Sequence, residues 1–309
     1  MTKKLLSSCF TKSSVALATA VASTALTTSS FAADAKDAKE VTQTVVQEAP
    51  DSNLHGLLNL DFGDHYITPR GLDVQDQGLV FQPMLLLFWD LYKDKDGFIN
   101  DVSLTTGIWN SIHSDYKGVG GTTPAWAEFD TIAGIGVKFA KNWEFDATHL
   151  MFTSPSDAFT TSQNLELNLA YHDACFGQFS INPYTKLFIE LANTATVGTT
   201  QESYNIEVGM DPKYVFKSFP VTLELPSYIT FPGTKFYSTS STVGLVSTAF
   251  KATVPLTFIP QSYGHWSMYA QVAYYHLVND GLVAGNNLLG GSYNERNLVK
   301  FSGGISIFF

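Results

Sequence analysis

Charged residues recur at alternating positions along many segments of this 309-residue chain, where they would share one face of a β-strand. The candidate set comprises ten acids and four lysines: Asp101, Glu128, Asp130, Lys138, Glu144, Asp146, Glu166, Lys186, Glu190, Glu207, Asp211, Glu224, Lys251 and Lys300. Carboxylates in a narrow pore favour cations, because the low-dielectric wall focuses their field. The pattern therefore predicts pore-lining residues with a weak preference for cations. The alternative is that these charges pair across strands and fill the interior.

The elements that would position these charges are long strands with a period of two. In 162–174, Leu165, Leu167 and Leu169 alternate with Glu166 and Asn168. The predicted strands are 54–64, 78–91, 99–113, 126–140, 143–154, 162–174, 180–193, 202–216, 219–231, 244–259, 265–279 and 296–309. All twelve exceed the usual ~5–6 residues and meet the ~9–11 that a tilted strand needs to cross a bilayer.

The connections between these strands alternate in length. The second, fourth and later even-numbered strands are followed by short turns, such as KN at 141–142, whereas most other connections are long. Short turns on one side and long loops on the other are typical of bacterial outer-membrane barrels, as is an even strand number. The sequence therefore predicts an all-β chain forming a transmembrane antiparallel up-and-down β-barrel of about 12 strands, with a secreted β-sandwich as the alternative.

The C-terminal strand separates the two faces most clearly. Phe301, Ile305, Ile307 and Phe309 would point to lipid, while the small polar residues between them would face a wet lumen. A final strand that ends in phenylalanine also resembles the signal by which the outer-membrane assembly machinery recognises its clients. Aromatic residues at other strand ends suggest interfacial girdles: Trp143, Phe231, Tyr237, Tyr263 and Trp266.

One predicted strand departs from this alternation. Residues 78–91 are apolar on both faces and include Pro83. Its lumen-facing side chains need a partner inside the barrel. We expect a plug, a folded-in loop or the N-terminal leader to supply it.

The N-terminus indicates export. Residues 1–32 combine Lys3 and Lys4 with a small-residue apolar stretch and SFAAD, and are predicted to be a signal peptide cleaved after Ala32, with Ala33 as the alternative. Residues 33–53 are predicted to be a flexible periplasmic leader, and 54–309 the barrel. Cleavage would remove three lysines and shift the net charge from −10 to −13, which argues against nucleic acid as a partner.

Catalytic and metal-binding patterns are weak. His113 precedes Ser114 and Asp115 in a predicted loop, but the motifs of outer-membrane phospholipases and lipid A deacylases are missing. The stretch 94–100 (DKDGFIN) lacks two ligands of a calcium loop, and no histidine or cysteine pair has zinc-ligand spacing. We predict no catalytic residue, metal or cofactor.

The first half of the chain is similar to a known family. The runs 66–78 (YITPRGLDVQDQG), 102–111 (VSLTTGIWNS) and 127–136 (AEFDTIAGIG) resemble the TorF-like porins, with Tyr66, Arg70, Gly71, Gly107 and Trp109 at the matching places. The match covers about the first six strands. It implies an outer-membrane porin of unassigned solute.

These observations predict a channel for passive diffusion of small hydrophilic solutes in the bacterial cell outer membrane. The expected partners are outer-membrane lipid and lipopolysaccharide, the assembly machinery and the solutes. Two alternatives remain open, an outer-membrane lipid-modifying enzyme and a non-conducting structural or surface-interaction barrel.

Overall fold

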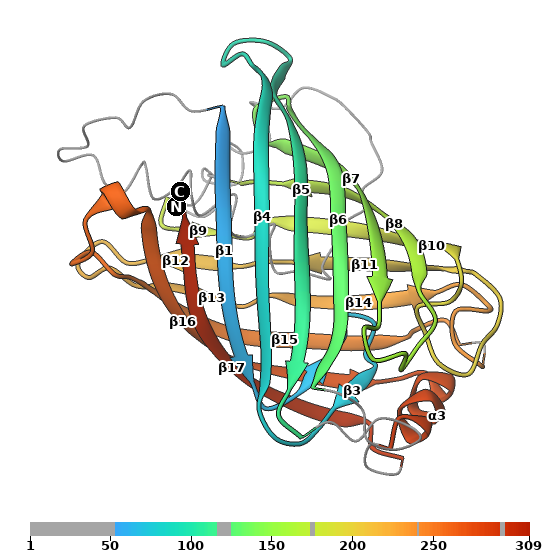
Figure 1. Cartoon of the computed structure of the whole chain (residues 1–309). Helices are drawn as coiled ribbons and strands as arrows, with labels where there is room; N and C mark the ends of the chain where they lie inside the picture. The colour runs from blue at the N-terminus through green and yellow to red at the C-terminus, as the bar shows by residue number, and fades with distance from the viewer. Residues whose placement is uncertain (1–52, 116–124, 174–176, 240, 291–293) are drawn as a thin grey trace, which may run out of the picture.

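A computed structural model describes residues 53–115, 125–173, 177–239, 241–290 and 294–309. The predicted signal peptide and all but the last residue of the predicted leader lie outside these ranges. The described chain forms a closed antiparallel 12-strand β-barrel (Figure 1). Each wall strand pairs with its neighbours in sequence, so the topology is up-and-down, as predicted.

Nine wall strands each form a single element, and these run close to the predicted ranges. They are β1 (Leu54–Gly63), β4 (Val80–Lys93), β5 (Ile99–His113), β6 (Trp126–Phe139), β7 (Trp143–Thr153), β8 (Ser162–Tyr171), β15 (Leu245–Pro255), β16 (His265–Leu277) and β17 (Asn297–Phe308). The barrel closes where β1 pairs with β17, from Leu57 opposite Phe308 to Gly63 opposite Ser302. An even strand number makes the first and last strands antiparallel neighbours.

Three strands predicted as continuous are each broken in two. The pieces are β9 (Phe179–Ser180) and β10 (Pro183–Ala192), β11 (Tyr204–Met210) and β12 (Lys213–Val215), and β13 (Thr222–Glu224) and β14 (Ser227–Pro232). Asn182 has a positive φ of 48°, and Pro212 and Pro226 have no N–H to donate to the ladder. The short pieces pair in the order β9–β12–β13–β15 at the end of the barrel away from the α-helix (Figure 1).

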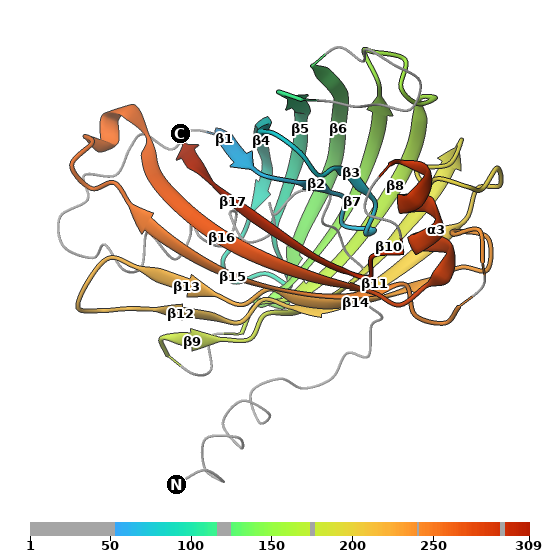
Figure 2. The same ribbon diagram turned by 90° about the horizontal axis from the view of Figure 1, so that it is seen from below.

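The connection from β1 to β4 folds into the barrel. It forms a small hairpin of β2 (Tyr66–Ile67) and β3 (Asp73–Gln75), separate from the wall sheet. Figure 2 shows this hairpin within the ring of strands. Residues 64–79 are called the inward loop below. Of the three occupants expected for the apolar inner face of 78–91, the structure shows a folded-in loop.

A short helix, α3 (Asp280–Leu288), lies beside the inward loop in the connection from β16 to β17 (Figure 2). Its N-cap is Asn279, whose side chain accepts hydrogen bonds from the N–H groups of Gly281 and Leu282. A 3-10 turn, η1 (Gln261–Tyr263), connects β15 and β16. In the part of the chain that the structure describes, no helix combines the length and hydropathy needed to cross a membrane.

The buried apolar cluster lies inside the barrel, where the inward loop and α3 meet the wall. Gly71 is central to it, because a Cβ there would lie 2.5 Å from Leu245 and 2.8 Å from Leu282, and its φ is +85°. On the outer face, by contrast, large apolar side chains such as Leu104, Ile135 and Phe250 are exposed.

Candidate functional site in the barrel lumen

The charged residues predicted to line the lumen are all buried or partly buried. Nine are at most 8% exposed: Asp101, Glu128, Asp130, Glu166, Lys186, Glu190, Glu207, Glu224 and Lys251. The other five are partly buried: Lys138, Glu144, Asp146, Asp211 and Lys300. Apolar residues that alternate with them, such as Ile135, Phe145 and Val208, are exposed.

Each of the four predicted lumen lysines has a carboxylate within 4 Å. Lys186 Nζ lies 3.0 Å from Glu207 Oε1, and Lys251 Nζ lies 2.8 Å from Glu224 Oε2. Both pairs join residues that are directly opposite on neighbouring strands. The remaining two are Lys138–Glu144 at 3.4 Å and Lys300–Asp61 at 3.9 Å. Sequence reasoning missed Asp61, although it shares the alternation of Asn59 on β1.

Five acids of the predicted set make no ion pair among the described residues: Glu128, Asp130, Asp146, Glu166 and Glu190. Glu128 accepts a hydrogen bond from the hydroxyl of Tyr66, at 2.8 Å. Glu190 accepts from the backbone N–H groups of Ala195, at 2.6 Å, and Ser203, at 2.9 Å. The lumen therefore carries more acid than its lysines neutralise.

The inward loop is held by hydrogen bonds to its backbone and side chains. Tyr228 donates to the carbonyl of Pro69 at 3.0 Å, and Tyr237 donates to the carbonyl of Arg70 at 2.6 Å. The side chain of Asn286 on α3 donates to the Gly71 carbonyl at 3.0 Å and accepts from the Asp73 N–H at 3.1 Å. Tyr237 was predicted to sit in an interfacial girdle. That was wrong, because it is 2% exposed and anchors the loop.

Arg70 of the inward loop is buried against two aromatic rings of the wall. Its guanidinium carbon lies 4.3 Å from the ring centroid of Phe188 and 5.2 Å from that of Phe152. The arginine is 6% exposed and makes no ion pair with the described residues. Its charge acts on four of the five surplus acids, Asp146 being the exception. The pattern of the sequence contains no signal that places Arg70 there.

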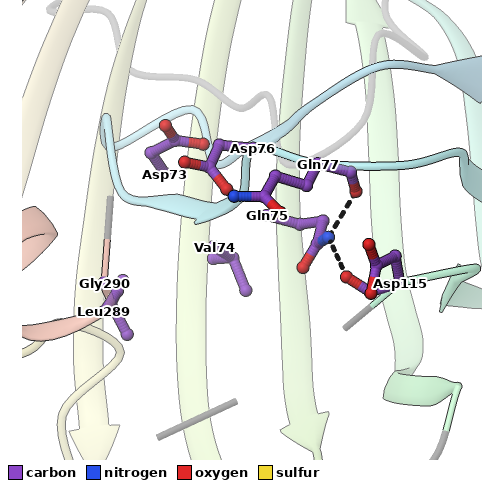
Figure 3. A pocket seen from close by; sticks show the side chains of 8 residues that line it. All are labelled: Asp73, Val74, Gln75, Asp76, Gln77, Asp115, Leu289 and Gly290. Atoms are coloured by element: carbon purple, nitrogen blue, oxygen red, sulfur yellow. Dashed lines mark hydrogen bonds between the residues drawn. The ribbon is translucent and has the colours of Figure 1, made fainter. Parts of the chain in front are cut away.

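A pocket lies at the rim of the barrel, between the inward loop and the end of α3 (Figure 3). It has about 340 Å³ of empty volume, part of which is open solvent, and is lined by Asp73, Val74, Gln75, Asp76, Gln77, Asp115, Leu289 and Gly290. The Gln75 side chain donates to the carbonyl of Asp115 at 2.6 Å. Burial raises the pKa of Asp73 to about 7, with neighbouring His65 opposing the shift.

The histidine considered for catalysis has a serine partner, although not the one in the predicted cluster. His113 Nε2 lies 2.8 Å from Ser111 Oγ, and both side chains are at most 1% exposed. Ser111 also accepts a hydrogen bond from the Gln82 side chain, at 3.2 Å. Ser114 Oγ instead accepts from the Leu79 N–H at 2.8 Å. The Ser–His contact faces the lumen beneath Tyr66, whose ring is 6.0 Å from that of His113.

The C-terminal strand has the alternation that its sequence predicts. Phe301 and Phe309 are 59% and 55% exposed and Ile305 and Ile307 are partly buried, while Ser306 on the other face is 3% exposed. The Phe309 carbonyl accepts from the Gly56 N–H at 2.6 Å, and the Phe309 N–H donates back at 2.9 Å. The chain is thus paired to its last residue. Recognition of these four residues by the assembly machinery stays a prediction.

The sequence matches no model of a protein family, and no curated protein is similar to it in sequence. The resemblance to the TorF-like porins is therefore not supported by a family match. What the structure shows of that expectation is a closed antiparallel β-barrel.

Several solved structures have a similar overall fold. The NanC porin is 11% identical, covers 82% of this chain and 98% of its own, and gives a TM-score of 0.44. Outer membrane phospholipase A from Escherichia coli is 11% identical over 81% of this chain and 92% of its own, also with a TM-score of 0.44. The translocator domain of the autotransporter NalP from Neisseria meningitidis is 13% identical over 92% of this chain and 99% of its own, with a TM-score of 0.40. These likenesses concern architecture alone, and the assignment to closed antiparallel barrels rests on this chain's own strand pairing.

Proposed function

We propose that this protein is a channel of the bacterial outer membrane for passive diffusion of small hydrophilic solutes, with a weak preference for cations. The observation that carries the proposal is the division between the faces of the wall. Large apolar side chains are exposed outside the barrel, whereas inside it buried charged side chains with an excess of acid accompany the apolar cluster around the inward loop. A soluble β-protein would have the opposite arrangement, with an apolar interior and a polar surface.

The cation preference follows from the acids that no lysine neutralises. Glu128, Asp130, Glu166 and Glu190 lie close enough to Arg70 of the inward loop for its charge to act on them. The pocket between the inward loop and the end of α3 adds three more acids, Asp73, Asp76 and Asp115 (Figure 3). Carboxylates held in a low-dielectric wall raise the local concentration of cations and repel anions.

The inward loop would control the width of this route. Apart from backbone hydrogen bonds at its two ends, from Asp64 to Phe301 and from Ser114 to Leu79, it is attached by side-chain hydrogen bonds and by packing. The wall, by contrast, is held by continuous ladders. Because the loop pairs with no wall strand, it can shift without breaking the barrel. We therefore propose that conduction requires the loop to move, with the wall unchanged.

The test is the conductance of the refolded protein in a planar bilayer under a salt gradient. It compares the wild type with a variant in which residues 66–75 are replaced by a short Gly-Ser link. The variant should conduct several-fold more than the wild type, with a reversal potential on the cation side. A matched control shortens the exposed loop at 155–160, which should leave the conductance unchanged.

Two results would contradict the proposal. A loop-deleted barrel that folds and never conducts would make the channel wrong and favour a structural or surface-interaction barrel. Anion preference would keep the channel but refute the role of the surplus acids.

A lipid-modifying enzyme is the second candidate, and the Ser111–His113 contact is the observation that favours it. Against it, the pair faces the lumen and not the apolar outer wall where lipid chains would lie. A serine-reactive phosphonate applied to the wild type should leave Ser111 unlabelled. Labelling of Ser111, together with release of fatty acid from phospholipid vesicles, would favour the enzyme.

A further inference from the structure

Arg70 reaches the lumen through a tight turn of the inward loop. The Gly71 N–H donates to the Thr68 carbonyl at 2.8 Å, and the Leu72 N–H donates to Thr68 Oγ1 at 3.1 Å. Pro69 occupies the second position of this turn, where its fixed φ is favourable. The turn places the arginine at the tip of the segment, with its side chain directed away from the loop.

The wall presents a flat aromatic surface to this side chain. Phe152 on β7 and Phe188 on β10 are stacked, with centroids 6.3 Å apart and an interplanar angle of 10°. Both rings lie within the range of a cation–π contact with the Arg70 guanidinium. Guanidinium is planar and weakly hydrated, so it stacks on such rings better than an ammonium group does.

Carboxylates lie around the two rings. Asp130 is directly opposite Phe152 across the β6–β7 pair, and Glu166 is opposite Phe188 across the β8–β10 pair. Arg70 nevertheless has no ion pair with them, and its Nε has no hydrogen-bond partner among the described residues. A buried arginine with a purely structural role is normally bound bidentately by a carboxylate. Here the charge is balanced by several acids at longer range and by the aromatic faces.

All of these cation-recognising groups belong to the barrel wall, whereas the cation belongs to a loop that pairs with no wall strand. We infer that the lumen contains a binding site for a small guanidinium-type organic cation, formed by Phe152, Phe188, Glu128, Asp130, Glu166 and Glu190, and that Arg70 occupies this site as an internal ligand. A solute cation of the same class would compete with Arg70 and displace the loop tip. The inference rests on the proposed channel function for the route by which a solute reaches the site.

The test measures binding and conduction separately on the full-length refolded protein, with methylguanidinium as the probe and methylammonium as the matched control ion. Binding is read as the rise in the thermal unfolding midpoint in detergent. Arg70→Ala should bind methylguanidinium, and the wild type should bind it much more weakly, because Arg70 competes. Adding Phe188→Ala to the Arg70→Ala variant should weaken binding about tenfold, the size of a buried cation–π contact.

Arg70→Gln serves if the alanine variant does not fold, since it keeps a polar side chain, although a shorter one, without the charge. Arg70→Lys should bind the probe less than Arg70→Gln does, because the lysine still occupies the site. Methylammonium should raise the unfolding midpoint of Arg70→Ala less than methylguanidinium does.

The outcomes separate the two proposals. Binding together with block of the sodium current supports both, and binding without any conduction supports the site and refutes the channel. Conduction without binding to either uncharged variant refutes the site and keeps the channel. Equal effects of the two cations on Arg70→Ala would overturn the assignment to the guanidinium class.

Discussion

The two halves of the lumen are filled by different means. Towards the short turns, lysines and acids on the wall itself pair across strands, as in Lys186–Glu207 and Lys251–Glu224. Towards α3, the lumen is filled by the inward loop, whose contacts join residues far apart in sequence, such as Tyr237 and Arg70. The first kind of contact is tied to strand register and cannot change without disturbing the wall. The second kind involves a hairpin that is separate from the wall sheet, and we propose that this half controls passage.

The largest loss of stability is expected from a substitution in the half of the lumen that is filled by ion pairs. Lys251→Met would leave Glu224, 2% exposed, without its lysine. A buried charge without its partner costs about 3–5 kcal/mol, so the free energy of unfolding should fall by that order. Denaturant unfolding in detergent micelles measures it.

The double variant Lys251→Met/Glu224→Leu is the matched control. It should recover most of the loss, because two apolar side chains of similar volume replace the pair. If the single variant were as stable as the wild type, the pair would have no structural role and the contrast between the halves would fail.

A change of pH should alter how firmly the inward loop is bound in the half of the lumen towards α3. The pKa of Asp73 is raised to about 7 by burial, while Asp64, Asp76 and Glu295 add to the shift and His65 opposes it. We call the inward loop docked when it is bound against the wall. A carboxyl whose pKa is raised in the docked loop stabilises the docked state most at pH values below its ordinary pKa near 4. This stabilisation is lost as the pH rises to about 7. Docking should therefore weaken by up to about tenfold per pH unit in this window.

The measurement is single-channel open probability between pH 5 and pH 7, which should increase with pH. Asp73→Asn cannot ionise, so it should remove this dependence and keep the loop docked. A pH response that is identical in Asp73→Asn would assign the effect to another group.

The smallest predicted effect comes from one anchor of the inward loop. Tyr237→Phe removes the hydrogen bond to the Arg70 carbonyl and leaves that buried acceptor unpaired, at a cost of about 1–3 kcal/mol to docking. Open probability should rise, while unfolding of the wall should change little. Tyr274→Phe is the matched control, since its hydroxyl bonds Asn297 on the exposed side and should leave conduction unchanged. A Tyr237→Phe variant that conducts like the wild type would show that the anchor does not limit opening.

The positions of prolines in the sequence did not by themselves predict where the wall strands break. Pro83 lies within the continuous strand β4, whereas Pro212 and Pro226 lie where strands break. A proline always lacks an N–H, but whether that interrupts a strand depends on how the neighbouring strands are paired at that point. The break near Asn182 has a further cause, because Asp173 accepts hydrogen bonds from the Ile181 and Asn182 N–H groups, at 2.7 and 2.6 Å.

The sequence by itself determined the barrel. The period of two sets which face of each strand is apolar, the alternation of turn lengths sets the topology, and together they place Glu166, Lys186 and Glu207 on one face. Only the tertiary structure decided what fills the lumen. Arg70 meets Phe152 and Phe188, which lie 82 and 118 residues further along the chain, and no local preference encodes such a contact. It arises because the closed wall brings distant strands around one space, and the inward loop is long enough to enter it.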